Sequence, residues 1–220
     1  LPPEGALSAF GRPGGTDMPA TELAALLAYA TAMAFTPGPN TTLSAAMAAN
    51  HGLAHAMRFV FAVPFGWCLL LLACAAGLGT LMTTVPALGA AIRVAGAAYM
   101  LWLAWKLAQR ARASTGDAAS SRSALDVGFA RGVALQFVNG KAWINALTIA
   151  GTWIAVDGQV VSRLAWVLPI AAAYGFASNF TYAAVGAGLR RWLAQGERLL
   201  WFNRAMALVL AATALWMLLS

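Results

Sequence analysis

Two short groups of polar and helix-weakening residues interrupt apolar stretches of this chain. The first group is Pro37-Gly38-Pro39-Asn40, and the second comprises Gln136, Asn139, Gly140 and Lys141. Proline deletes a backbone donor and glycine loosens the helix around it, so a helix should open at such a point. Within a membrane, an opened backbone is tolerated only where protein buries it or a hydrated cavity solvates it. The two groups therefore predict a site at which a small polar substrate is translocated.

Lys141 is the one ionisable residue that the sequence places deep in an apolar stretch, about 18 Å of helix beyond Phe129. Burying its charge is costly, so the side chain should face a cavity or a partner. Its ammonium group could attract a substrate carboxylate, or desolvation could favour its neutral form and let it exchange a proton. Alternatively, it extends along the helix to water or binds the carbonyl groups freed at the break over residues 37–40. These interpretations are compatible, because a substrate could displace such carbonyl groups.

The amide side chains offer neutral donors and acceptors, which a zwitterionic amino acid needs. Asn40 and Asn139 are interpreted as site residues in preference to packing contacts, and both interpretations stay open for Gln136. Backbone amides at the start of a half-helix could receive a carboxylate. The alternative for Gly140 is a close-packing position between helices. Interhelical hydrogen bonds are favoured over substrate contacts at four further positions: Trp143, Asn145, Asn179 and Tyr182.

The composition predicts an integral membrane protein with an all-α fold. Hydrophobic residues make up 61% of the 220 residues and charged residues only 10%, far from the averages of soluble domains. A membrane-spanning helix needs about 20 largely apolar residues. Six stretches meet that requirement: Leu23–Ala49, Phe59–Leu81, Ala87–Trp105, Phe129–Val156, Ala165–Leu189 and Leu199–Leu219. The first and fourth contain the polar groups, so we expect six transmembrane helices of which the first and fourth are broken.

These stretches are expected to form a single membrane domain over residues 18–220. Residues 108–126 are rich in Ala, Ser and Gly and predict a cytoplasmic linker between the halves 18–107 and 127–220. Three helices in each half force the second half to enter the membrane upside down, so related halves would form a 3+3 inverted repeat. Residues 1–17 lack the positive segment of a secretory signal and are interpreted as an extension or a disordered N-terminus.

Basic residues are unevenly distributed between the two predicted faces of the membrane domain. Ten of the 14 Lys and Arg residues fall near the first, third and fifth connections. By the positive-inside rule these connections are cytoplasmic and both termini lie outside. The net charge of +7 reflects this basic rim. A nucleic-acid surface would interleave aromatic and basic residues, and that pattern is missing, so we expect no nucleic-acid partner.

Several motifs resemble the LysE/RhtB family of bacterial amino-acid exporters over most of the chain. They are Thr36-Pro37-Gly38-Pro39-Asn40, Asn50-His51-Gly52, the run 96–106, and the fourth-stretch residues Phe129, Gly132, Gln136, Asn139 and Lys141. The runs 134–139 and 97–106 look closest to the cysteine/O-acetylserine exporter branch. The chain departs from the family pattern at Gly140, where proline is usual, and at Asn40, where many relatives carry aspartate.

The resemblance implies a secondary transporter in the bacterial inner membrane that exports small amino acids or their derivatives by alternating access. We expect the proton-motive force to drive it without a cofactor. Its expected partners are the amino-acid substrate and the lipid bilayer, with a homodimer as a possible assembly. A proton relay through a buried carboxylate is not expected, because all seven acidic residues lie in connections or at the edges of the apolar stretches.

The sequence leaves two other classes of function to consider. A non-transporting scaffold or accessory subunit would use the polar groups only to lock helices together. An intramembrane enzyme would need a nucleophile with a base, or a metal cluster, and the sequence shows neither. His51 and His55 lack a third ligand, while Cys68 and Cys74 are interpreted as small buried hydrophobic residues. We therefore expect no enzymatic activity and no metal site.

Overall fold

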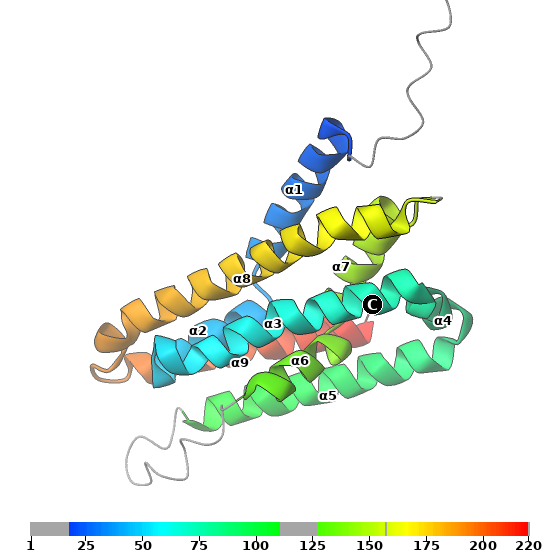
Figure 1. Cartoon of the computed structure of the whole chain (residues 1–220). Coiled ribbons are helices and arrows are strands. Elements are labelled where there is room, and N and C mark those ends of the chain that lie inside the picture. Colours follow the sequence, from blue (N-terminus) through cyan, green and yellow to red (C-terminus); the bar gives the residue numbers. More distant parts are fainter. Residues whose placement is uncertain (1–17, 111–126, 157, 220) are drawn as a thin grey trace, which may run out of the picture.

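The computed structural model describes residues 18–110, 127–156 and 158–219, and every regular element in these ranges is helical. The α-helices in Figure 1 are α1 (Ala20–Phe35), α2 (Pro39–His51), α3 (Leu53–Ala73), α4 (Gly79–Thr84), α5 (Pro86–Arg110), α6 (Phe129–Val138), α7 (Gly140–Ile149), α8 (Val160–Leu193) and α9 (Arg198–Leu219). Two π-helical turns, η1 (Cys74–Leu78) and η2 (Ala150–Ile154), follow α3 and α7. The expected all-α class is confirmed for these residues.

Four continuous helical segments of the described residues are long and apolar enough to cross a membrane. They are Leu53–Leu81, Pro86–Gln109, Val160–Leu193 and Arg198–Leu219. Each corresponds to one predicted stretch but extends beyond the predicted limits, because polar and basic residues at the ends continue the helix. The other two predicted stretches are each divided into two shorter helices. The arrangement of six crossings as a 3+3 repeat stays a prediction.

The first predicted break lies where the sequence places its two prolines. The helix α1 ends at Phe35 and α2 begins at Pro39, where a missing backbone donor costs nothing because a first-turn donor has no partner inside a helix. The Thr41 hydroxyl accepts from the backbone N–H of Gly38 and donates to its carbonyl oxygen, both at 3.0 Å. Thr41 therefore stabilises the start of α2, where the backbone changes from extended to helical.

The second break forms without a proline. The helix α6 ends at Val138, Asn139 adopts an extended backbone, and α7 begins at Gly140. The Asn139 side chain caps α7 by accepting from the Lys141 backbone N–H at 3.2 Å. Asparagine is a favoured N-cap because its oxygen satisfies a donor that the helix leaves unpaired. Figure 1 shows α7 turning away from the direction of α6.

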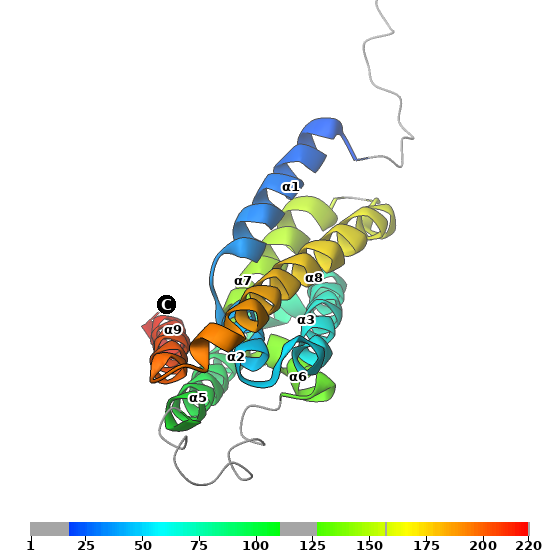
Figure 2. The same cartoon turned by 90° about the vertical axis from the view of Figure 1, so that its left-hand side faces the viewer.

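The two helices of the first broken stretch differ sharply in their packing. In Figure 2, α2 lies among α3, α5, α6, α8 and α9. Ten of the 13 residues of α2 are buried. By contrast, α1 has only two buried residues among 16, Leu26 and Ala30, and it projects away from the bundle in Figure 1. The stretch therefore joins a central helix to a peripheral one.

Two of the predicted segments lie partly or wholly outside the described residues. The helix α5 continues to Arg110, so residues 108–110 are helical and do not belong to a linker. The rest of the predicted linker, residues 111–126, and the predicted N-terminal extension, residues 1–17, lie outside the described residues. The domain boundaries otherwise stay predictions.

Candidate functional site

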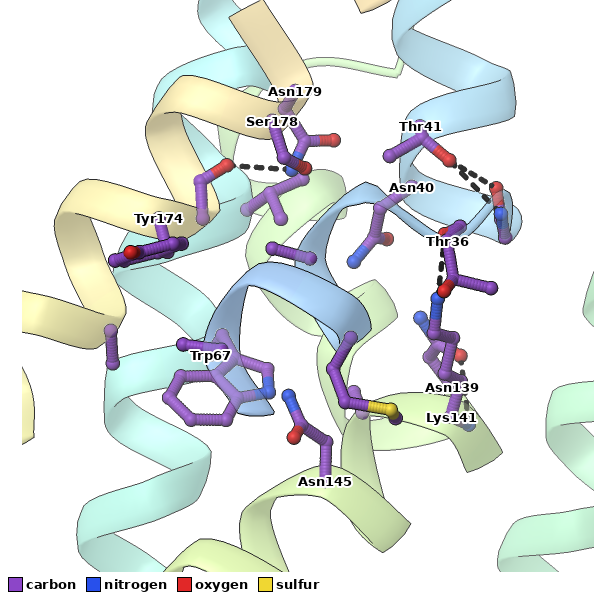
Figure 3. Close-up of a pocket in the computed structure, with 18 of the residues that line it drawn as sticks. Thr36, Asn40, Thr41, Trp67, Asn139, Lys141, Asn145, Tyr174, Ser178 and Asn179 are labelled. Atoms are coloured by element: carbon purple, nitrogen blue, oxygen red, sulfur yellow. Dashed lines mark hydrogen bonds between the residues drawn. The ribbon is translucent and has the colours of Figure 1, made fainter. Parts of the chain in front are cut away.

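A cavity of about 90 Å³ lies between the two helix breaks, with room for several water molecules. Its walls come from α1, α2, α3, α7 and α8, together with the residues of both breaks. Figure 3 labels the polar and amphipathic side chains of its wall, which are Thr36, Asn40, Thr41, Trp67, Asn139, Lys141, Asn145, Tyr174, Ser178 and Asn179. Aspartate and glutamate are absent from this lining. The cavity thus combines one cation with neutral hydrogen-bonding groups.

Lys141 connects the two breaks. Its Nζ atom donates a hydrogen bond of 2.7 Å to the carbonyl oxygen of Thr36, the residue that follows α1. Its aliphatic stem lies against Gly38, where an added Cβ would stand 3.1 Å from Cδ and 3.3 Å from Nζ. The structure therefore brings Lys141 to the Pro37–Asn40 segment and pairs it with a carbonyl group freed by the break, as one of the sequence interpretations anticipated.

Asn40 and Gln136 form a reciprocal amide pair between α2 and α6. Asn40 Nδ2 donates to Gln136 Oε1 at 2.8 Å, and Gln136 Nε2 donates to Asn40 Oδ1 at 3.2 Å. Gln136 is fully buried and also donates to the Gly132 carbonyl at 3.0 Å. Asn40 lines the cavity, but its amide is already engaged with Gln136. This pair stabilises the contact of two helices, which favours the packing interpretation for Gln136.

Five of the eight predicted site residues line the cavity: Gly38, Pro39, Asn40, Asn139 and Lys141. The other three are Pro37, Gln136 and Gly140, and they do not line it. A Cβ added to Gly140 would stand 3.0–3.3 Å from three atoms of Met217 in α9. Gly140 thus permits close contact with α9, as its alternative interpretation predicts.

The helix α8 supplies cavity residues that the site prediction left out. Tyr174 and Ser178 are four residues apart and line the cavity, and Tyr182 follows at the same interval. Side chains at this spacing share one face of a helix. Tyr182 donates to the Phe35 carbonyl at 2.9 Å, while the Tyr174 hydroxyl accepts from Thr31 at 3.2 Å. The periodic polar face was the signal that could have found this wall in the sequence.

Interhelical bonding was predicted for four other positions, and the outcome differs among them. Tyr182 bonds to the end of α1, and Asn179 Oδ1 accepts from the Ser44 hydroxyl of α2 at 3.0 Å, as predicted. Trp143 donates to the Phe137 carbonyl at 2.8 Å, across the second break. The Oδ1 atom of Asn145, however, is buried and has no hydrogen-bond partner among the described residues.

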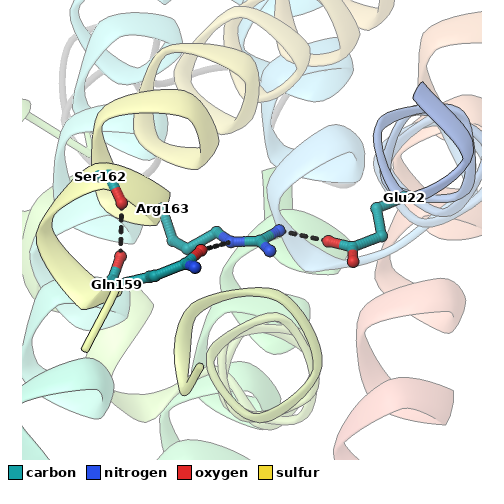
Figure 4. A network of polar contacts seen from close by, with 4 residues as sticks. All are labelled: Glu22, Gln159, Ser162 and Arg163. Carbon is teal, nitrogen blue, oxygen red and sulfur yellow. Dashed lines mark hydrogen bonds and ion pairs between the residues drawn. The ribbon is translucent and has the colours of Figure 1, made fainter. Parts of the chain in front are cut away.

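The other end of α1 is held by an ion pair. Arg163, near the start of α8, pairs with Glu22 in the first turn of α1, and its Nε atom donates to Gln159 at 3.3 Å (Figure 4). Arg163 is only 8% exposed, so its charge depends on this pairing. The peripheral helix is therefore attached at its first turn through Glu22 and at its C-terminal end through the carbonyl groups of Phe35 and of Thr36, which follows it.

The described residues contain no group of three His, Cys, Asp or Glu side chains that could hold a metal ion. Cys68 and Cys74 are both unbridged, and Cys74 is buried while Cys68 is partly buried. The rings of His51 and His55 lie 4.8 Å apart, at the junction of α2 and α3.

Comparison with known proteins gives consistent matches. A family model described as LysE type translocator matches residues 31–220. The cysteine/O-acetylserine efflux protein of Escherichia coli (strain K12) is 31% identical over 199 residues, which cover 90% of this chain and 100% of that relative. The protein of the same name from Klebsiella pneumoniae is 31% identical over 193 residues, covering 86% of this chain and 94% of the relative. No solved structure gives a significant match.

Proposed function

The chain belongs to the LysE type translocator family, whose members are transporters and not enzymes, and from this premise we propose that it exports small amino acids or their derivatives. Its four long apolar helices support a multi-pass location in the bacterial inner membrane. Because its relatives are named cysteine/O-acetylserine efflux proteins, cysteine and O-acetylserine are the first candidate substrates.

The contact of Lys141 with Thr36 is the observation that carries this proposal. The contact joins two helix breaks at a cavity that several polar side chains help to line, so a carboxylate that enters the cavity can reach the Lys141 ammonium group. In a cavity without acidic lining residues, the substrate itself would supply the counter-charge for Lys141. A small molecule that carries a carboxylate is therefore the favoured ligand.

The bond to Thr36 suggests how binding is coupled to movement. A carboxylate forms a stronger, charge-assisted hydrogen bond with an ammonium group than a neutral carbonyl does. We propose that the substrate displaces the Thr36 carbonyl from Lys141 and so removes one of the attachments of α1. The remaining attachments near the break are the Tyr182 and Tyr174 hydroxyl groups.

Alternating access is the transport mechanism that we propose. The sparse burial of α1 and the dense burial of α2 support it, because a weakly packed helix can move about a break while its neighbour stays fixed. After each break the chain forms one shorter helix, α2 or α7, and then two segments that are long enough to cross a membrane. This matching order supports a 3+3 inverted repeat. In this scheme the loops rich in basic residues are cytoplasmic, both termini are outside, and the proton-motive force drives export without a cofactor.

Purified protein in liposomes provides the test. Exchange and efflux of labelled cysteine, O-acetylserine, threonine and lysine should be measured with and without a pH gradient. We expect saturable movement of at least one small neutral amino acid, and the pH gradient should accelerate it. Movement no faster than in empty liposomes for the whole panel would contradict it.

A scaffold or accessory subunit is the competing function, and the amide pairs between helices favour it. Besides Asn40 and Gln136, Asn50 and Asn203 exchange hydrogen bonds of 2.8 and 3.2 Å between α2 and α9. Such pairs lock helices and require no substrate. A scaffold would show no transport in liposomes, so the same experiment separates the two functions.

A further inference from the structure

Asn145 stands out on the cavity wall because its hydrogen bonding is incomplete. Its Oδ1 atom is the one buried side-chain oxygen or nitrogen of the described residues that lacks a partner. Buried acceptors are rarely left unpaired, since folding has removed their water. Figure 3 shows Asn145 at the cavity beside Trp67. An acceptor in this position can pair with a donor that enters the cavity.

The spacing between Asn145 and Lys141 suits a bifunctional ligand. The two residues are four positions apart on α7 and both line the cavity, so they lie about 6 Å apart along the helix axis. One molecule in the cavity can therefore contact both side chains. The carboxylate and the neighbouring ammonium of an α-amino acid would give each of them a partner.

The other amide oxygens of the cavity wall are already occupied. The Oδ1 atoms of Asn40, Asn139 and Asn179 each accept a hydrogen bond from within the protein. The lining also contains no carboxylate that could receive a cation. Among the amide oxygens of this wall, the one on Asn145 is therefore left for an ammonium group.

We propose that Asn145 Oδ1 accepts a hydrogen bond from the α-ammonium group of the substrate while Lys141 binds its carboxylate. Since Oδ1 is covered in this conformation, the amide turns about χ2, a torsion that is broad and roughly two-fold in asparagine. This inference rests on the proposed function and adds a specific requirement to it. The site distinguishes an amino acid from a carboxylic acid of similar size that lacks the amine.

Asn145 could instead serve only to orient Trp67, its neighbour in Figure 3. In that case its substitution would weaken all ligands alike or only lower the stability of the protein. A ligand series that varies the amine and the carboxylate separately distinguishes this structural role from the proposed one.

The test measures binding of three probes to the purified full-length protein by calorimetry under reducing conditions. The probes are L-cysteine, 3-mercaptopropionate, which lacks the amine, and cysteamine, which lacks the carboxylate. The wild type should bind cysteine roughly tenfold or more tightly than 3-mercaptopropionate, as expected for a hydrogen bond to a charged donor. Asn145→Leu and Asn145→Ala should remove this preference by weakening binding of the two probes that carry an amine, cysteine and cysteamine, while binding of 3-mercaptopropionate stays unchanged.

Thr148→Val is the matched control, because the Thr148 hydroxyl bonds to the Ile144 carbonyl on the same helix and does not line the cavity. This variant should keep the preference for cysteine. If both Asn145 variants retain the preference, or weaken the two acids equally, the role of Asn145 is refuted while the proposed function stands. If the wild type binds none of the probes and transports none of the liposome panel, both proposals fail.

Discussion

Gly96 of α5 packs directly against the carbonyl oxygen of Val138, the last residue of α6. A Cβ added at Gly96 would collide with that oxygen and would also stand 2.9 Å from Cε of Met217. The oxygen belongs to backbone at the second break and cannot move aside as a flexible side chain could. The position of the second break therefore depends on the absence of a side chain at Gly96, a residue of another helix.

Gly96→Ala should disturb the second break. We expect a loss of about 1–3 kcal/mol of stability, typical of an overpacked site, and a large loss of transport. Gly188→Ala is the matched control, because a Cβ added at this position of α8 meets no atom within 4 Å. Thermal unfolding in detergent compares the two variants. Equal melting temperatures for both would show that the contact with Val138 does not constrain the break.

Gly38→Ala tests the other break with a different expected result. The added Cβ would stand 3.1 Å from Cδ of Lys141, which belongs to a flexible side chain and can shift. The backbone of Gly38 is extended, so alanine adopts it without strain. We expect transport to fall severalfold while the melting temperature stays close to that of the wild type. A variant that transports normally would show that the placement of Lys141 against Gly38 is unimportant.

The Asn40–Gln136 pair should contribute to stability. Asn40→Ala removes the partner of a fully buried amide, so we expect a destabilisation of about 1–3 kcal/mol. Replacing both residues with leucine should cost less than the single change, since no polar group is then left unpaired. Unfolding of the single and double variants measures this difference. A double variant less stable than the single one would contradict the structural role of the pair.

The Glu22–Arg163 pair should hold the first turn of α1. Glu22→Gln leaves the buried Arg163 without its carboxylate partner, so we expect a lower melting temperature and faster proteolysis within residues 20–35. Exchanging the two residues, Glu22→Arg with Arg163→Glu, should restore part of the stability. If the Glu22→Gln variant is cleaved within residues 20–35 no faster than the wild type, other contacts are sufficient to hold α1.

The sequence predicted the positions of both breaks because their residues act locally. Two prolines flanking Gly38 cannot continue a helix, and Asn139 is a favoured cap. The proximity of Lys141 to the first break also followed, since a buried charge needs a partner. Partner choice could not be predicted for Gln136, because an amide suits a helix contact and a substrate equally well. The ion pair of Arg163 with Glu22 forms only because α1 packs on α8, and no local sequence pattern predicts that packing.

In the proposed function, Lys141 binds the carboxylate of the transported amino acid. The most direct measurement is efflux of labelled cysteine from liposomes containing Lys141→Met. Lys106→Met is the control, since Lys106 is the only other lysine in the sequence and its Nζ lies 4.4 Å from the centre of the Trp102 ring, away from the cavity. We predict that Lys141→Met abolishes cysteine efflux while Lys106→Met preserves it. Efflux by Lys141→Met at the wild-type rate would contradict the claim.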